Sequence, residues 1–124
     1  KELKLQQRVS LEEYVKIHPE ATYIPVSEYP KGGHAVWAIE CYAAFPCATQ
    51  NELTEFDAKN LLKNGCVSVS EGANMPSTPK AVELFLNNKV CFAPAKAANA
   101  GGVAVSEFEM SQNAAMAKWT FEKV

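Results

Sequence analysis

The chain has 124 residues, of which 48% are hydrophobic and 21% are charged, and its formal net charge is −2. This composition is typical of a folded globular domain and excludes a disordered chain. The basic residues are too scattered to indicate a nucleic-acid-binding surface, and no apolar run is long enough to cross a membrane. We therefore expect a single domain spanning residues 1–124, located in the cytoplasm.

Residues 1–34 are expected to form a variable N-terminal segment. Ser10 and Glu13 have the spacing of a capping box, which predicts a short helix over residues 11–17 that stops before Pro19. Residues 21–26 lie next to prolines and are expected to be extended.

Residues 35–124 alternate between strand-like and helix-like patterns. The first strand should be buried on both faces, because its sequence is almost wholly apolar. Strands are expected at residues 35–45, 66–70 and 90–93. Helices are expected from the N-cap Thr54 to Lys63, from the N-cap Thr78 to Asn87, and over residues 101–118.

The order β-α-β-α-β-α with short connections is typical of right-handed parallel crossovers. We predict an α/β fold, a three-layer half-Rossmann domain with a short, mainly parallel sheet flanked by helices. In such sheets ligands bind beyond the carboxyl ends of the strands. The loops at residues 46–51, 71–75 and 94–102 should therefore meet along one rim of the sheet.

These three loops offer binding chemistry instead of an acid, a base or a nucleophile. Their polar side chains are Thr49, Gln50 and Asn51 in the first loop, Asn74 in the second and Asn99 in the third. Amides suit a carboxamide or sugar hydroxyls, and the nearby glycines would let a flat ligand approach the backbone. The alternative is that these amides cap helix ends and turn corners.

The four cysteines are Cys41, Cys47, Cys66 and Cys91. They include no CxxC pair, so their spacing indicates neither a metal site nor a dense disulfide framework. Each lies in or beside an apolar run, and we expect buried, reduced thiols.

Three runs of the sequence resemble a known family. The runs PCATQNEL, EGANMPSTP and FAPAKAANAGGVAVS, followed by EMSQN, are similar in order and spacing to the motifs of the hexameric glutamate dehydrogenases. The resemblance is gap-free from Trp37 to about Trp119. It implies that the chain is the later half of a cofactor-binding domain, with NAD or NADP as cofactor and oxidative deamination of glutamate as the family reaction.

The resemblance also suggests roles for individual residues. The positions implied to contact the coenzyme are Thr49, Gln50, Asn74 and Asn99. Val103 and Ser106 match positions that meet the far end of the glutamate side chain. A helix serine can instead bond back to the preceding turn, which is the alternative for Ser106. No catalytic residue is assigned, because the family's catalytic Lys and Asp belong to a domain that precedes this region.

Parts of a complete enzyme are missing from this sequence. The GxGxxG turn that holds a coenzyme pyrophosphate is absent, so weak or absent coenzyme binding is expected of this chain. One hypothesis is therefore an enzyme segment that works only when the other parts are supplied. The second is an excised or engineered scaffold, in which the exposed edge of the strand at residues 35–45 associates with another copy through residues such as Tyr42 and Val67.

Overall fold

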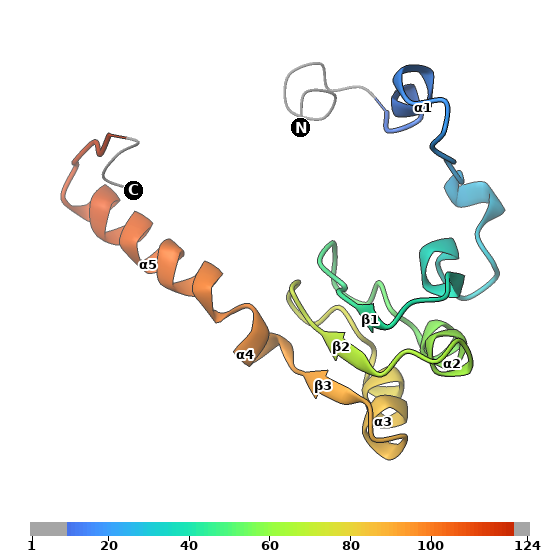
Figure 1. Cartoon of the computed structure of the whole chain (residues 1–124). Helices are drawn as coiled ribbons and strands as arrows, with labels where there is room; N and C mark the ends of the chain where they lie inside the picture. The colour runs from blue at the N-terminus through green and yellow to red at the C-terminus, as the bar shows by residue number, and fades with distance from the viewer. Residues whose placement is uncertain (1–9, 121–124) are drawn as a thin grey trace.

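The computed structural model describes residues 10–120, which form a small parallel sheet with helices beside it (Figure 1). The strands are β1 (Ala43–Ala44), β2 (Ser68–Ser70) and β3 (Cys91–Ala93). They lie in the order β1-β2-β3, and both pairs are parallel. Helix α2 (Glu55–Lys63) connects the first two strands and α3 (Pro79–Asn87) the last two. The predicted α/β fold with a parallel sheet flanked by helices is confirmed.

The core lies between the sheet and these two helices. Ala44 of β1 pairs with Val69 of β2, which pairs in turn with Phe92 of β3, so the three side chains form a row across the sheet. Leu61 of α2 and Phe85 of α3 are fully buried in the same cluster. Helices α2 and α3 also pack against each other, as the ribbon shows (Figure 1).

The ends of α2 follow the local sequence signals. The Thr54 side chain accepts a hydrogen bond from Asp57 N, and the Asp57 side chain accepts one from Thr54 N, which completes a capping box. At the other end, Asn64 is the C-cap and Gly65 has a φ of 80°, a conformation that glycine adopts without strain. Helix α3 also begins after its predicted cap, Thr78, but the Thr78 hydroxyl makes no capping bond.

The prediction of a strand over residues 35–45 is wrong for most of that range. Ala35–Ala38 form the 3-10 helix η3, and only Ala43–Ala44 join the sheet. The chain bends here because Trp37 is buried in the core, where its indole N–H donates to Glu52 O at 3.3 Å. Burial on both faces is also wrong, since Ile39 and Tyr42 are 60% and 78% exposed.

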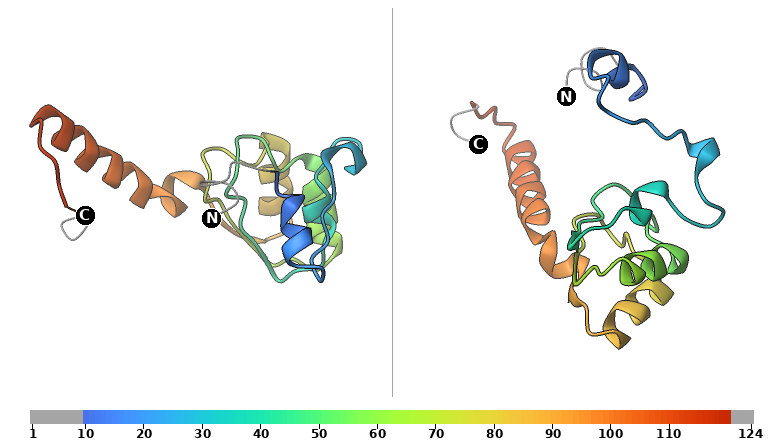
Figure 2. Two further views of the ribbon diagram at one scale, coloured as in Figure 1. Left: turned by 90° about the horizontal axis from the view of Figure 1, so that it is seen from above. Right: turned by 45° about the vertical axis from the view of Figure 1, so that its right-hand side comes forward.

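The N-terminal segment lies apart from the core. Helix α1 (Glu13–Ile17) falls within the predicted helix, although Ser10 Oγ accepts from Glu12 N at 3.3 Å instead of forming the expected capping box. The expected extended stretch leads into the 3-10 helix η2 (Val26–Glu28). Neither helix contains a buried residue, and Figure 2 shows the segment arching away from the sheet.

The C-terminal helix is also uncovered. The predicted helix at residues 101–118 is present as α5 (Ala100–Ala114), which follows the short α4 (Ala95–Ala98). Helix α5 leads away from the sheet (Figure 2) and has no buried residue. Its large apolar side chains are exposed, Val103 by 69% and Phe108 by 61%.

Candidate functional site

The three loops at the carboxyl ends of the strands meet, as the sequence predicts. The loop after β1 binds the loop after β2, because Gly72 N and Ala73 N both donate to Pro46 O at 3.0 Å. A second contact joins the same loops, from Asn51 N to Met75 O at 3.0 Å. The loop after β3 reaches the loop after β2 through Asn99 and Ala95.

A buried carboxylate, which sequence reasoning missed, fixes two of these loops to each other. Glu71 is 5% exposed and directly follows β2. Its Oε2 accepts from Ala95 N, at the start of α4, at 2.8 Å. Its Oε1 accepts from Ser77 N, ahead of α3, at 3.3 Å. The only signal in the sequence is an acidic residue at the end of a buried strand, which does not identify these partners.

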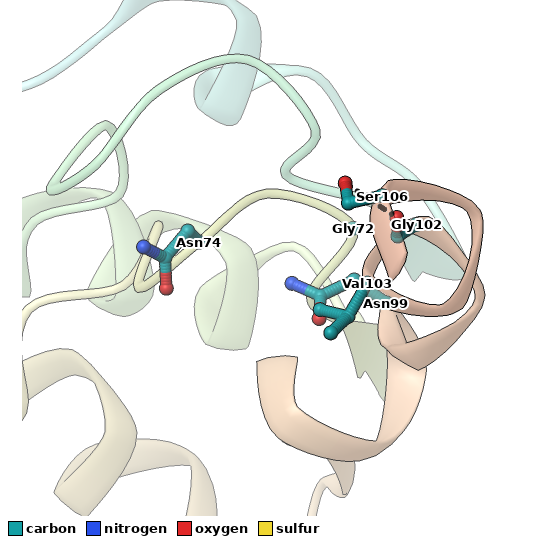
Figure 3. Close-up of a pocket in the computed structure, with 6 residues that line it drawn as sticks. All are labelled: Gly72, Asn74, Asn99, Gly102, Val103 and Ser106. Atoms are coloured by element: carbon teal, nitrogen blue, oxygen red, sulfur yellow. Dashed lines mark hydrogen bonds between the residues drawn. The ribbon is translucent and has the colours of Figure 1, made fainter. Parts of the chain in front are cut away.

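An open pocket of about 400 Å³ lies where the loops after β2 and β3 meet α5 (Figure 3). Its lining residues are Gly72, Asn74, Asn99, Gly102, Val103 and Ser106. Four of the six residues that the sequence suggested as binding residues therefore share one pocket. Asn74 comes from the loop after β2, and the other three come from the first turns of α5 and the residue before it.

Asn99 is held in place, whereas Asn74 is not. The Asn99 Nδ2 group donates to Ala73 O at 2.9 Å, which ties the start of α5 to the neighbouring loop. Asn99 thus has the structural role that was the alternative to ligand binding for these amides. Its side-chain oxygen remains an acceptor at the pocket, and Asn74 lines the opposite part of it as an exposed side chain (Figure 3).

Ser106 bonds within its own helix. Its Oγ donates to Gly102 O at 3.1 Å, which confirms the alternative of a helix serine bonding to the preceding turn. The hydroxyl is exposed and can turn its hydrogen toward a ligand at a small cost. Val103 lies on the preceding turn and gives the pocket its apolar wall.

The structure places Thr49 and Gln50 outside this pocket. Ala48 N and Thr49 N donate to Glu52 Oε1, at 2.7 and 3.2 Å, so the carboxylate of Glu52 shapes the first loop. Gln50 lines a neighbouring pocket together with Lys96.

At Gly72 the pocket wall lies close to the Cys47 side chain. A Cβ atom at Gly72 would collide with the Cys47 sulfur, so the backbone of this loop packs closely against the first loop. At Gly102, by contrast, a Cβ atom would meet open space at the pocket itself. The amides of Asn74 and Asn99 lie beside exposed backbone and fit a carboxamide or a ribose, and none of the lining residues is an acid or a base.

Residues 10–120 contain neither a metal-binding cluster nor a membrane-spanning helix. These residues contain no group of His, Cys, Asp and Glu side chains suited to hold a metal ion. None of the helices in the same range is long and apolar enough to span a membrane.

Comparison with known proteins gives consistent matches. The model of the family described as Glutamate/Leucine/Phenylalanine/Valine dehydrogenase matches residues 1–124. The NADP-specific glutamate dehydrogenase of Helicobacter pylori strain J99 is 55% identical over the whole chain, which covers 28% of that protein. That of Escherichia coli K12 is 55% identical over 92 residues, covering 74% of this chain and 21% of that protein.

A solved structure agrees with these sequence matches. The glutamate dehydrogenase of Plasmodium falciparum superposes with a TM-score of 0.77 at 46% sequence identity, covering 98% of this chain and 24% of that one. The chain thus spans only about a quarter of the length of these relatives.

Proposed function

This chain belongs to the Glutamate/Leucine/Phenylalanine/Valine dehydrogenase family, and we propose that it forms the nicotinamide side of the coenzyme site of a glutamate dehydrogenase. The proposed reaction of the whole protein is the NAD(P)-dependent oxidative deamination of glutamate. The observation that carries the proposal is the pocket at the carboxyl ends of parallel strands, which joins Asn74, Asn99, Val103 and Ser106.

The residues of the pocket suit both the coenzyme and the substrate glutamate. A bound nicotinamide coenzyme would accept the hydride from the substrate. Asn99 would position the coenzyme's carboxamide or ribose, and its bond to Ala73 O fixes the amide before the ligand arrives. Val103 and Ser106 lie one turn apart on α5, where the first would contact the methylenes of glutamate and the second would donate to its distal carboxylate.

The pocket supplies binding without proton transfer. Because its lining residues include no acid or base, the proton transfers would depend on other parts of the whole enzyme. The chain alone should therefore not catalyse the reaction. We expect it to bind NADPH with a Kd weaker than about 1 mM, which calorimetry can measure.

A chimeric enzyme tests the proposal directly. The 124-residue segment of the Helicobacter pylori enzyme that matches this chain is replaced by the present sequence. We expect glutamate-dependent reduction of NADP⁺. Asn99→Ala should raise the KM for NADP⁺ about tenfold, the effect of losing roughly 1.4 kcal/mol of binding.

Two further variants separate the two halves of the pocket. Ser106→Ala should raise the KM for glutamate and leave that for NADP⁺ unchanged. Ser111→Ala, an exposed serine of the same helix outside the pocket, should change neither. A folded chimera without activity, or one in which Asn99→Ala behaves like Ser111→Ala, would contradict the proposal.

A second candidate function is self-association without catalysis, in a chain that serves as a scaffold. It is favoured by β1, which within residues 10–120 pairs with β2 only and so leaves one edge of this sheet open. Tyr42 and Phe45, at either end of β1, are 78% and 63% exposed. The proposed partner is a second copy of this chain, aligned along the same edge about a two-fold axis.

Light scattering on the isolated chain tests this candidate. We expect a concentration-dependent dimer that the double variant Tyr42→Lys and Phe45→Lys dissociates, because charge at the edge opposes pairing. Val26→Lys changes an equally exposed apolar residue far from the sheet and should leave the dimer intact. A monomer at every concentration would rule out self-association.

A further inference from the structure

Two cysteines, Cys41 and Cys66, each lie two residues ahead of a strand, the first ahead of β1 and the second ahead of β2. Ala43 pairs with Ser68, and Val67 N donates to Tyr42 O at 3.0 Å. Cys41 and Cys66 lie one residue beyond this bond and outside the ladder, since Cys66 N donates to Leu61 O at 3.0 Å. Adjacent strands are about 4.8 Å apart, which is within the range of roughly 4.4 to 6.8 Å between the Cα atoms of disulfides. Residues that continue a strand pair at this spacing can therefore reach each other through a disulfide.

The two side chains also interact. Cys66 belongs to the buried core, and Cys41 packs against it. Burial raises the pKa of the Cys41 thiol above its usual value, and the neighbouring Cys66 thiol, which donates to Ser68 O at 3.2 Å, raises it further. Both cysteines are free thiols in this structure, so the pair is present in its reduced form. The prediction of buried thiols is correct for Cys66 and wrong for Cys47 and Cys91, which are exposed.

Solvent reaches Cys41 but hardly reaches Cys66. An open pocket of about 480 Å³ is lined by Glu40, Cys41, Tyr42, Asn64 and Gly65. Cys41 can therefore meet a small reagent, whereas Cys66 is only 5% exposed. Glu40 places a carboxylate at this pocket, which favours a neutral or cationic reagent over an anionic one.

We propose that Cys41 and Cys66 form a thiol–disulfide exchange site for small, uncharged or cationic disulfides. At alkaline pH, where the Cys41 thiol ionises, the Cys41 thiolate attacks one sulfur of the reagent, forms a mixed disulfide and releases the first small thiol. Cys66 then attacks the Cys41 sulfur, and the second small thiol leaves. The protein gives up two electrons and two protons, and the reagent is reduced to two thiols. The product covalently links the segment ahead of β1 to the segment ahead of β2.

The test treats the 124-residue chain with 2-hydroxyethyl disulfide and identifies the products by intact mass and peptide mapping. We expect the loss of two hydrogens and a cross-link between Cys41 and Cys66. Thermal unfolding of the oxidised chain should shift to a higher temperature, since the bond restricts the unfolded chain. A cross-link that involves Cys47 or Cys91 instead would overturn the proposal.

Variants assign the two roles. Cys66→Ala, a small substitution at the buried position, should stop the reaction at a stable mixed disulfide on Cys41. Cys47→Ser is the matched control on an exposed cysteine and should cross-link like the parent chain. A persistent mixed disulfide on Cys41 in the parent chain, with Cys66 still reduced, would also overturn the proposal, and this readout does not depend on any variant folding.

Discussion

Replacing Asp57 by alanine is expected to lower the free energy of unfolding by about 4 kcal/mol, because two partly buried backbone N–H groups would lose their charged acceptor. Asp57 is fully buried. Its Oδ1 accepts from His34 N at 2.9 Å, and its Oδ2 accepts from Thr54 N at 2.9 Å and lies 2.8 Å from Thr54 Oγ1. One carboxylate thus both caps α2 and attaches the segment that precedes η3.

Urea denaturation followed by circular dichroism measures this effect. Asp57→Asn keeps the shape and one acceptor oxygen, so its loss of stability should be roughly half as large. Glu55→Gln changes a carboxylate in the same first turn that is bound to Lys59 at the surface, and it should have little effect. If Asp57→Ala and Glu55→Gln were equally stable, the assigned role of Asp57 would be wrong.

Replacing Glu71 by alanine is expected to cost about 3 kcal/mol of stability and to loosen the candidate site. The side chain is buried, and its removal leaves Ser77 N and Ala95 N without their acceptor. Because Ala95 begins the α4 and α5 stretch, the loss should disturb the position of Asn99 relative to the loop after β2. The position of Asn99 in the site should therefore change more than a uniform loss of stability would explain.

Hydrogen exchange distinguishes these two consequences. In Glu71→Ala the amides of Ser77 and Ala95 should exchange much faster than in the parent chain, while the amides within α2 should change only as global stability changes. Glu83→Ala, an exposed carboxylate on α3, serves as the control and should leave both sets unchanged. Unchanged protection at Ala95 in Glu71→Ala would show that another group holds the loop.

Much of the fold could be predicted from short-range signals. The start of α2 follows from Thr54, its end from Asn64 and Gly65, and the start of α3 from Pro79 at its first position. Each of these signals acts within a few residues, through a cap or a backbone conformation, and so does not depend on the rest of the molecule. The alternation of strands and helices then favoured a parallel sheet, because short crossovers are right-handed.

The candidate site was predicted in part for a related reason. Parallel strands bring the loops at their carboxyl ends together, and this rule correctly joined Asn74 to Asn99 and α5. It could not predict which way each side chain points, and the structure places Thr49 and Gln50 outside that pocket. Their role in coenzyme binding stays a prediction.

The sequence by itself determined the order of the elements, the α/β class and the resemblance to the glutamate dehydrogenases, since these depend on patterns of neighbouring residues. The tertiary structure decided that residues Ala35–Ala38 form a 3-10 turn and not a strand, and that Asp57 and Glu71 are buried. The physical reason is that these outcomes depend on partners distant in sequence. Asp57 binds the backbone of His34, and Glu71 that of Ala95, and neither pairing leaves a periodic pattern in the chain.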